Sequence, residues 1–511
     1  ALLNALKNLG TQRTFKYAQK FNSYLRAVLT TFNPEFMITN FERDIQTALI
    51  NIQADTDIKV TAKIIKDLIP AGAGVWKGLR DWKKDTTWKK WYKEYKEEGG
   101  AVGWFMGQSV EDKIAELEKV MKRAQQRANP MQAVRYLGKF IEDMNLVVEQ
   151  AVRLSTYKNL REAGLSKKEA AKISKELTVN FNQKGEMGSA INSLWLFSNA
   201  TIQGNYVWMR AFARSKKVKA ITMGLVVQSM IMSFINRMNG GDDWEKVSDW
   251  EKDNHWLYML PNGDVLKFKV PYGYNIFHVL GNVMEEAVVG KLSYGKALSR
   301  MLDATVQAFS PFGTGTGISQ YVPTIGGLKW GAELYTNENF MGTRIYPDQP
   351  PFSAKKPSSQ LYFDSVRPST KAVTDWLNKT TGGSEKVSGN IDISPEALDH
   401  LIDGIGGSTL RFVRNSVETG KTLVKGGKFE SYRRIPFVRQ FITEPSKYTL
   451  KYKAKDMLDE SARTIFTEQQ KEDFKKYVKI SKQEGVLSGK DAKKWIKDFN
   501  KNQRKAKRSM K

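Results

Sequence analysis

Apolar residues recur at helical spacing along most of the chain. In residues 34–52 the apolar positions of one face are Phe36, Ile38, Phe41, Ile45 and Leu49. Residues 133–164 and 167–177 continue this spacing of three to four residues. Ser166, followed three positions later by Glu169, is typical of a capped helix start. The pattern predicts mainly α structure.

Two segments depart from this periodicity. Residues 256–260 and 265–270 are β-prone runs joined by a loop that contains Asn262 and Gly263, which predicts a hairpin. Between residues 310 and 389 Gly and Pro accumulate, which indicates an irregular segment that wraps another subunit rather than forming its own core. We therefore expect a mainly α, multi-segment helical protein with one small β-hairpin and a long irregular segment.

A chain of 511 residues exceeds the roughly 250–300 residues at which a single hydrophobic core stops growing. We expect four regions along it. They are an N-terminal helical region with a Trp/Lys-rich segment (1–192), a region with an apolar helix, the hairpin and central helices (193–309), an irregular Gly/Pro-rich wrapping segment (310–392), and a C-terminal helical region with a basic tail (393–511).

Two segments are candidates for membrane contact. Residues 76–96 alternate aromatic rings with Lys and Arg, and residues 220–235 carry no charge and are flanked by basic residues. Both patterns fit a lipid boundary, and both also fit a helix that packs in a protein core with its lysines extended outward. The candidate lipid-contacting residues are Trp76, Trp82, Trp88, Trp91, Tyr92, Tyr95, Leu225, Val226, Met230, Ile231 and Phe234.

The chain is strongly basic, with a formal net charge of +27. Such a charge attracts polyanions, of which nucleic acid and acidic lipid are the common ones, although an ordinary solvated basic surface has the same composition. The cations are densest at the C-terminal end, where DNA or phosphate binding is expected at Lys490, Lys493, Lys494, Lys497, Lys501, Arg504, Lys505, Lys507 and Arg508. Binding through counterion release would not depend on base sequence.

Several classes of chemistry find little support in the sequence. The chain has no cysteine, which excludes disulfides, thiolate catalysis and cysteine-based zinc sites. Its histidines, His255, His278 and His400, are far apart and lack metal-binding spacing. No hydrolase, polymerase or nuclease signature is present, and we interpret Glu285 and Glu286 as helix-surface charge. We expect no enzymatic activity, no metal and no cofactor.

A series of short motifs resembles a known family. The motifs are Asn33-Pro34-Glu35-Phe36, Asn40-Phe41-Glu42-Arg43-Asp44, Asn239-Gly240-Gly241-Asp242-Asp243, Val270-Pro271-Tyr272-Gly273-Tyr274-Asn275, Ser310-Pro311, Asn337-Glu338-Asn339-Phe340-Met341-Gly342, Ile393-Ser394-Pro395-Glu396-Ala397-Leu398-Asp399-His400 with Gly406-Gly407, and Arg433-Arg434-Ile435-Pro436-Phe437-Val438-Arg439-Gln440-Phe441. Their order over residues 33–441 resembles the helical C-terminal region of phage large polyvalent proteins, the large polyvalent protein-associated domain family. The resemblance implies phage or mobile-element origin and, in short-tailed phages, parts of internal virion (ejection) proteins. It carries no catalytic motif.

Together these features predict a phage internal virion protein that associates with the double-stranded DNA of the phage genome and helps form a conduit across the host envelope. It would lie in the virion interior and, after ejection, at the host cell envelope. We expect contacts with other copies of itself, in a ring for example, with the portal or other internal virion proteins, and with the envelope membrane. Two alternatives stay open: a capsid-interior DNA-condensing or portal-associated structural protein without a membrane role, and a non-catalytic part of a larger virion enzyme. The chain starts at Ala1, so a processed product and a fragment of a longer polypeptide are both open.

Overall fold

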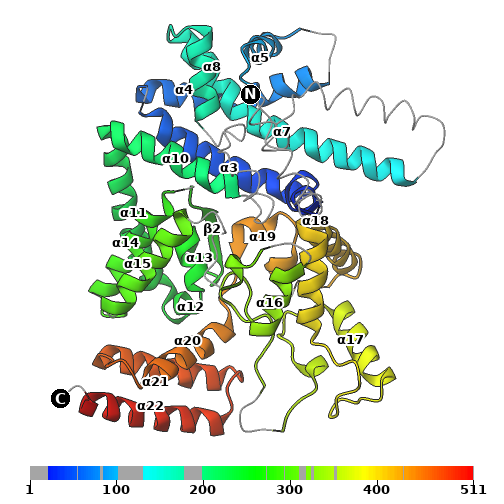
Figure 1. The fold of residues 1–511 in the computed structure, drawn as a ribbon, viewed down its shortest axis with the longest axis vertical. Helices are drawn as coiled ribbons and strands as arrows, with labels where there is room; N and C mark the ends of the chain where they lie inside the picture. The colour runs from blue at the N-terminus through cyan, green and yellow to red at the C-terminus, as the bar shows by residue number, and fades with distance from the viewer. Residues whose placement is uncertain are drawn as a thin grey trace, which may run out of the picture.

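The structure is a computed structural model. It describes residues 21–509 except positions 23, 55, 81–84, 102–129, 178–197, 272, 293, 310–317, 324–326, 350–353, 428 and 430. The described chain is mostly helical and has one small three-stranded antiparallel sheet, which confirms the predicted mainly α fold class. The first helices lie at one end of the long axis of the molecule and the last helices at the other (Figure 1).

The N-terminal unit is a group of helices around one apolar core. It consists of the π-helix η1 (Ala27–Thr31), α3 (Pro34–Ile52), α4 (Ile58–Leu79), α5 (Thr87–Glu97), α7 (Pro130–Glu162) and α8 (Lys167–Glu176). Helix α3 starts where expected, because the Asn33 side chain accepts a hydrogen bond from the Glu35 N–H and Pro34 occupies the first turn. The predicted capping box of Ser166 and Glu169 is present. The core includes Ala48, Ile52, Ile64, Val75, Leu154, Tyr157 and Leu160.

The central part contains the hairpin and the helices that pack beside it. Its elements are α10 (Ser198–Arg214), α11 (Lys216–Gly240), α12 (Asp242–Glu245), α13 (Asp249–Asn254), β1 (His255–Met259), β2 (Val265–Lys269), α14 (Asn275–Val288) and α15 (Tyr294–Phe309). The two strands pair antiparallel from His255 opposite Lys269 to Met259 opposite Val265, as the sequence predicts. A third strand, β3 (Ile442–Thr443), pairs with β2. It comes from a distant part of the chain, and no local pattern indicated it.

The region 310–392 is more regular than predicted. Its described part contains α16 (Leu328–Thr336), α17 (Pro368–Thr380) and the short 3-10 helices η2 (Ile318–Tyr321) and η4 (Ser358–Gln360). The Asp392 carboxylate accepts the backbone N–H groups of Ser358 at 2.6 Å and Ser359 at 2.8 Å, which closes the segment on itself. Helix α17 packs on α18 (Pro395–Val424). The described part of this region therefore contains helices of its own and packs against the rest of the same chain.

Helix α18 bends at Gly407, whose φ of +61° lies in the region that favours glycine. The bend brings α18 against η1, where Thr409 Oγ1 donates to the Val28 carbonyl at 2.6 Å. The chain continues through η5 (Tyr432–Arg434) and α19 (Val438–Phe441). Arg439 of α19 pairs at 2.6 Å with Glu35 of α3, which is fully buried. The later part of the chain is thus tied back to the N-terminal unit.

The predicted C-terminal region 393–511 divides into two packing groups. Helix α18 belongs with α17 and η1, whereas α20 (Lys447–Glu460), α21 (Glu468–Gln483) and α22 (Gly489–Ser509) surround a core of their own. That core contains Leu450, Ala454, Phe466, Phe474, Tyr477, Leu487, Trp495 and Phe499. We call α20–α22 the C-terminal unit; it forms the end of the molecule opposite α5 and α8 (Figure 1).

Candidate nucleic-acid interface

Helix α22 has one buried side and one basic side. Ala492, Trp495, Phe499 and Ala506 are buried against the other helices of the C-terminal unit. The cations that the sequence predicts to bind phosphate are all exposed: Lys490, Lys493, Lys494, Lys497, Lys501, Arg504, Lys505, Lys507 and Arg508. Residues 497, 501, 504, 505 and 508 fall on the side opposite the buried stripe. A helix of 21 residues is about 31 Å long, close to the roughly 34 Å of one DNA turn.

The basic side is held in place by aromatic packing and side-chain hydrogen bonds. The Phe499 ring stacks on Phe474 with 4.0 Å between centroids. The Gln503 amide donates to the carbonyls of Ser461 at 2.8 Å and Thr464 at 2.7 Å. These contacts fix α22 on the turn between α20 and α21, so the cations project from an ordered scaffold and less conformational entropy is lost when they bind a polyanion.

Helix α21 extends the basic surface. Lys475, Lys479 and Lys482 are exposed on it, whereas Phe474 and Val478 are buried in the shared core. Helix α21 contacts α22 directly. Two neighbouring helices therefore expose cations to solvent, a pattern typical of surfaces that bind nucleic acid without reading its sequence.

Polar contacts connect the C-terminal unit to the central part. The Tyr477 hydroxyl donates to Glu245 Oε2 at 3.1 Å. The ion pairs are Lys291 with Asp473 at 2.6 Å, Lys246 with Glu484 at 2.6 Å, Lys453 with Asp249 at 3.0 Å, and Lys476 with Asp242. We call these contacts the polar interface. The apolar core of the C-terminal unit draws all its described members from residues 450–499, so this core does not extend across the polar interface.

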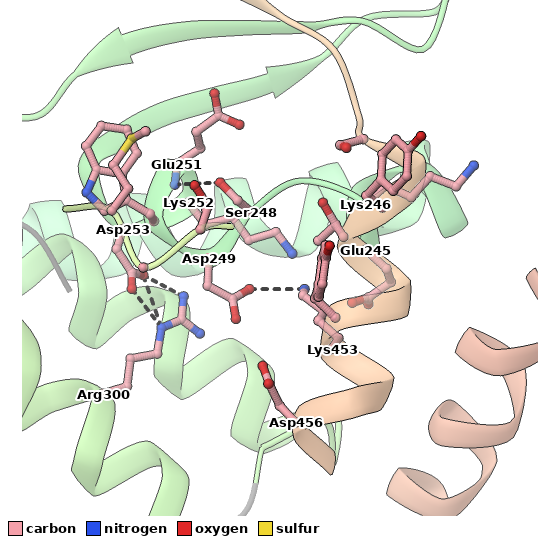
Figure 2. Close-up of a pocket in the computed structure, with 18 of the residues that line it drawn as sticks. Glu245, Lys246, Ser248, Asp249, Glu251, Lys252, Asp253, Arg300, Lys453 and Asp456 are labelled. Atoms are coloured by element: carbon pink, nitrogen blue, oxygen red, sulfur yellow. Dashed lines mark hydrogen bonds and ion pairs between the residues drawn. The ribbon is translucent and has the colours of Figure 1, made fainter. Parts of the chain in front are cut away.

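A cavity of about 810 Å³ lies beside the polar interface, between α13, α15 and α20. Figure 2 shows Lys453 pointing into it from α20 toward Asp249, and Arg300 reaching Asp253 from α15. Arg300 also contacts Glu286 at 2.6 Å. These cations of the wall thus already have acidic partners inside the protein, and their charges are not available to a ligand without breaking a pair.

Burial shapes the charges near this cavity. The Lys252 side chain is 3% exposed and its Nζ lies 4.4 Å from the centroid of the Trp244 ring. Burial lowers the pKa of Lys252 to about 8. Burial alone would raise the pKa of Glu245, but the positive charges of Lys252, Lys453 and Arg237 outweigh it and lower that pKa to about 2. Glu245 therefore stays ionised and can accept the Tyr477 hydrogen bond.

The central side of the polar interface and most of the cavity wall lie in one continuous part of the chain. Residues 241–438 match the family model described as large polyvalent protein associated domain 38. The match confirms the resemblance over less than half of the chain, within the range 33–441 from which it was inferred. It indicates a phage-associated protein. No curated protein and no solved structure shows a significant match.

The polyvalent-protein domain, residues 241–438, contributes α12 to α18 and the hairpin. Its first residues supply three acids that contact the C-terminal unit. Asp242 pairs with Lys476, Asp249 pairs with Lys453, and Glu245 accepts a hydrogen bond from the Tyr477 hydroxyl. The basic C-terminal unit follows the domain in sequence and contacts it in space. The phage-associated domain and the candidate nucleic-acid surface are therefore separate parts in direct contact.

The aromatic and basic segment 76–96 does not form a lipid-facing surface in this fold. Tyr95 is fully buried and Tyr92 is 5% exposed, and Trp76, Trp88 and Trp91 pack partly buried against the same core. Among the described lysines, Lys90 and Lys93 are exposed, an arrangement that fits the core interpretation of the pattern. Trp82 lies outside the described residues.

The apolar helix α11 divides its candidate residues between two sides. Leu225 and Val226 are buried at 8% and 4% exposure, so they face the protein and not lipid. Met230 is half-buried, and Ile231 and Phe234 are about half exposed. Among the described residues, α11 is the helix long and apolar enough to cross a membrane. The expectation of an outward apolar surface therefore holds for part of α11 only.

The interpretation of Glu285 and Glu286 as surface charge is wrong. Their exposures are 2% and 8%, because Glu285 pairs with Arg237 and Glu286 with Arg300. His278 is also buried, and its Nδ1 lies 2.7 Å from Ser229 Oγ. Sequence reasoning missed this polar interior. The signal was present as polar residues at helical spacing in residues 278–286, but the spacing does not tell which side faces inward.

Proposed function

We propose that this chain is a phage internal virion protein that binds the packaged double-stranded DNA and takes part in its delivery across the host envelope. The observation that carries this proposal is the basic side of α22, held opposite an aromatic core in the C-terminal unit. The family match supports the phage context. In this proposal the chain acts by binding and has no catalytic role, no metal and no cofactor.

DNA binding is tested with the full chain by fluorescence anisotropy on duplexes of unrelated sequence over a series of salt concentrations. The basic-face variant is K497Q/K501Q/R504Q/K505Q/R508Q. The control variant, K59Q/K63Q/K66Q/K168Q/K172Q, removes the same charge from exposed positions of α4 and α8.

We expect wild-type binding to weaken steeply as salt rises and to be similar for the different duplexes. The slope of log K against log salt is negative, and its magnitude should be smaller by up to about 4.5 in the basic-face variant, since each lost phosphate contact removes about 0.9. The control variant should keep the wild-type slope. No wild-type binding at low salt, or equal slopes in the two variants, would refute DNA binding through this surface.

The burial of Tyr92 and Tyr95 favours a second candidate, a capsid-interior DNA-condensing or portal-associated protein without a membrane role. It removes one of the two sequence arguments for lipid contact. DNA binding without any binding to vesicles would select this candidate over the ejection role.

Assembly is also part of the proposal. The partners would be other copies of the chain, as in a ring, and the portal or other internal virion proteins. Cryo-electron microscopy of particles before and after discharge tests the location. Density of this chain on the capsid exterior would contradict the internal position.

A further inference from the structure

Helix α11 turns apolar side chains toward the outside of the molecule. The stripe consists of Met223 (55% exposed), Val227 (56%), Ile231 (52%), Phe234 (50%), Ile235 (48%) and Met238 (69%). The stripe holds no charged residue, and Gln228 and Asn239 are exposed polar side chains beside it. A surface helix of a soluble protein normally shows the reverse arrangement, with its apolar stripe toward the core.

The same arrangement continues on the neighbouring helices. Exposed apolar residues are Met284 and Val288 on α14, Leu298, Leu302 and Val306 on α15, and Ile202, Tyr206 and Met209 on α10. Helix α14 packs against both α11 and α15, and α10 contacts α11 and α15. These helices lie together along one flank of the molecule (Figure 1). We call the exposed apolar residues of α10, α11, α14 and α15 the apolar flank.

The inward sides of these helices carry buried polar groups beside apolar residues such as Leu225, Val226 and Val283. Ser233 Oγ donates to Glu285 at 2.8 Å, and Arg237 Nε donates to Glu285 at 2.8 Å. Asn236 donates to the Leu257 carbonyl at 2.6 Å. The polar groups are therefore satisfied inside the layer, and they leave the outside free of hydrogen-bonding demands. An exposed apolar side above polar groups that are already paired suits a surface that does not face water.

The contact between α11 and α14 is close. A Cβ added at Gly281 would lie 2.3 Å from the Val226 carbonyl oxygen and 2.8 Å from the Ser229 Cβ. Small residues let the two backbones approach, as they do in helix pairs that cannot rely on the hydrophobic effect between them. The helix pair thus keeps its geometry through polar contacts, close backbone approach and buried residues such as Leu225 and Val283, and the apolar residues of its exposed side are not part of that packing.

The charged residues beside the apolar flank indicate whether an acidic bilayer or a second copy of the chain is the better cover for it. Lys216, Lys217 and Lys219 are exposed at the start of α11. A cluster of lysines at the end of an apolar stripe matches acidic lipid headgroups above a hydrocarbon layer. A second copy docked symmetrically through the same flank would bring its own Lys216, Lys217 and Lys219 close to these lysines, and that repulsion disfavours a copy as the cover of this flank.

We propose that the apolar flank docks on a bilayer that contains acidic lipids, with Lys216 and Lys219 against the headgroups. This inference rests on the proposed role at the envelope and specifies its membrane partner. It differs from the sequence prediction, because Leu225, Val226 and the rings of residues 92 and 95 belong to the interior, and helices α10, α14 and α15 supply much of the surface.

The test is co-flotation of the full chain with vesicles of phosphatidylcholine and phosphatidylglycerol, compared with pure phosphatidylcholine. The flank variant is V227S/I231S/F234S. The control variant, I58S/I65S/I69S, changes exposed apolar residues of α4. Circular dichroism melting of each protein verifies that it is folded, which is expected because every changed side chain is largely exposed.

We expect wild type to float with acidic vesicles. The flank variant should lose about tenfold or more in partition coefficient, because three apolar side chains no longer leave water. The control should stay within about twofold. K216Q/K219Q should weaken binding to acidic vesicles by about fivefold per lysine and change binding to neutral vesicles little.

An independent readout uses the absence of cysteine in the chain. An environment-sensitive dye on I231C should shift to the blue when acidic vesicles are added, whereas the same dye on K63C should not. Absence of wild-type flotation, or equal flotation of the flank and control variants, would overturn the proposal. So would oligomers in solution that dissociate only in the flank variant while vesicles remain unbound, since a second copy would then cover the flank. DNA binding measured on the same samples separates this outcome from failure of the proposed function.

Discussion

Arg237 on α11 and Glu285 on α14 form a two-point ion pair, with 2.8 Å between Nε and Oε1 and 2.9 Å between Nη2 and Oε2. Glu285 is 2% exposed and also accepts the Ser233 hydroxyl. A charge at such a position depends on its protein partners, because water cannot replace them. The pair is therefore a central element of the contact between α11 and α14.

Removal of Glu285 should destabilise the fold. We expect E285A to lower the free energy of unfolding by about 3 kcal/mol, the lower end for a broken buried pair, since Arg237 retains Glu245. Urea denaturation at pH 7 measures the change. E472A, at an exposed position of α21, should stay within about 0.5 kcal/mol. Equal midpoints for the two variants would show that the pair contributes nothing.

Gly281 should tolerate no side chain. G281A places a methyl group against the backbone of α11, so the helices must separate, at a cost of about 1–3 kcal/mol. G224A is the matched control, because nothing lies within 4 Å of a Cβ on that exposed side of α11. It should stabilise the protein by up to about 1 kcal/mol through helix propensity. Thermal melting that ranks G281A at or above G224A would contradict this packing.

Two buried histidines should make stability fall at mildly acid pH. Burial lowers the pKa of His278 to about 4 and that of His255 well below 6.5. The unfolded chain takes up these protons below about pH 6.5 and the folded chain does not, so stability present above pH 6.5 is lost as the pH falls toward 4. For His278 the loss between pH 7.5 and 5.0 is about 2 kcal/mol.

The measurement compares urea unfolding at the two pH values for wild type and H278Q. The variant is expected to be less stable than wild type at pH 7.5, since Nδ1 and Nε2 both have partners. Its own decrease on acidification should be about 2 kcal/mol smaller. Parallel pH curves would show that His278 does not exchange protons with folding.

Tyr95 and Tyr157 offer a matched pair in the N-terminal core, with 5.1 Å between ring centroids. The buried Tyr95 hydroxyl has no hydrogen-bond partner among the described residues, whereas the Tyr157 hydroxyl donates to Glu94 at 2.7 Å. We expect Y95F to be neutral or stabilising by about 1 kcal/mol and Y157F to cost about 1.5–3 kcal/mol. Thermal melts that reverse this order would contradict the assigned hydrogen bonds.

The sequence predicted helices well because the helical period is local. Asn33 and Ser166 mark helix starts by side-chain chemistry that involves residues only two or three positions away. Strand β3 escaped prediction, since two residues that pair with a strand some 180 positions earlier leave no local pattern. The cations of α22 were visible, but the role of Gln503 in holding the helix depends on carbonyls of a distant turn.

The sequence alone did not predict which face of each helix points into the protein. Helix α14 carries an apolar stripe with Met284 and Val288 and a polar stripe with His278, Asn282 and Glu285, and both are visible in the sequence. Periodicity gives the stripes, but their direction is set by partners in α11. In residues 76–96 the pattern was equally ambiguous between lipid contact and core packing, and there the Tyr95 ring is buried in the core.

The core of the C-terminal unit and the polar interface that attaches it should respond differently to salt. Aromatic contacts inside the unit, such as Phe474 with Phe499, are insensitive to dissolved ions, whereas a half-exposed pair such as Lys476 with Asp242 weakens as mobile ions screen it. We therefore expect added salt to weaken the exposed pairs of the polar interface before it affects the aromatic core of the three helices. The strength of the link between the cationic end and the rest of the molecule would then depend on the salt concentration.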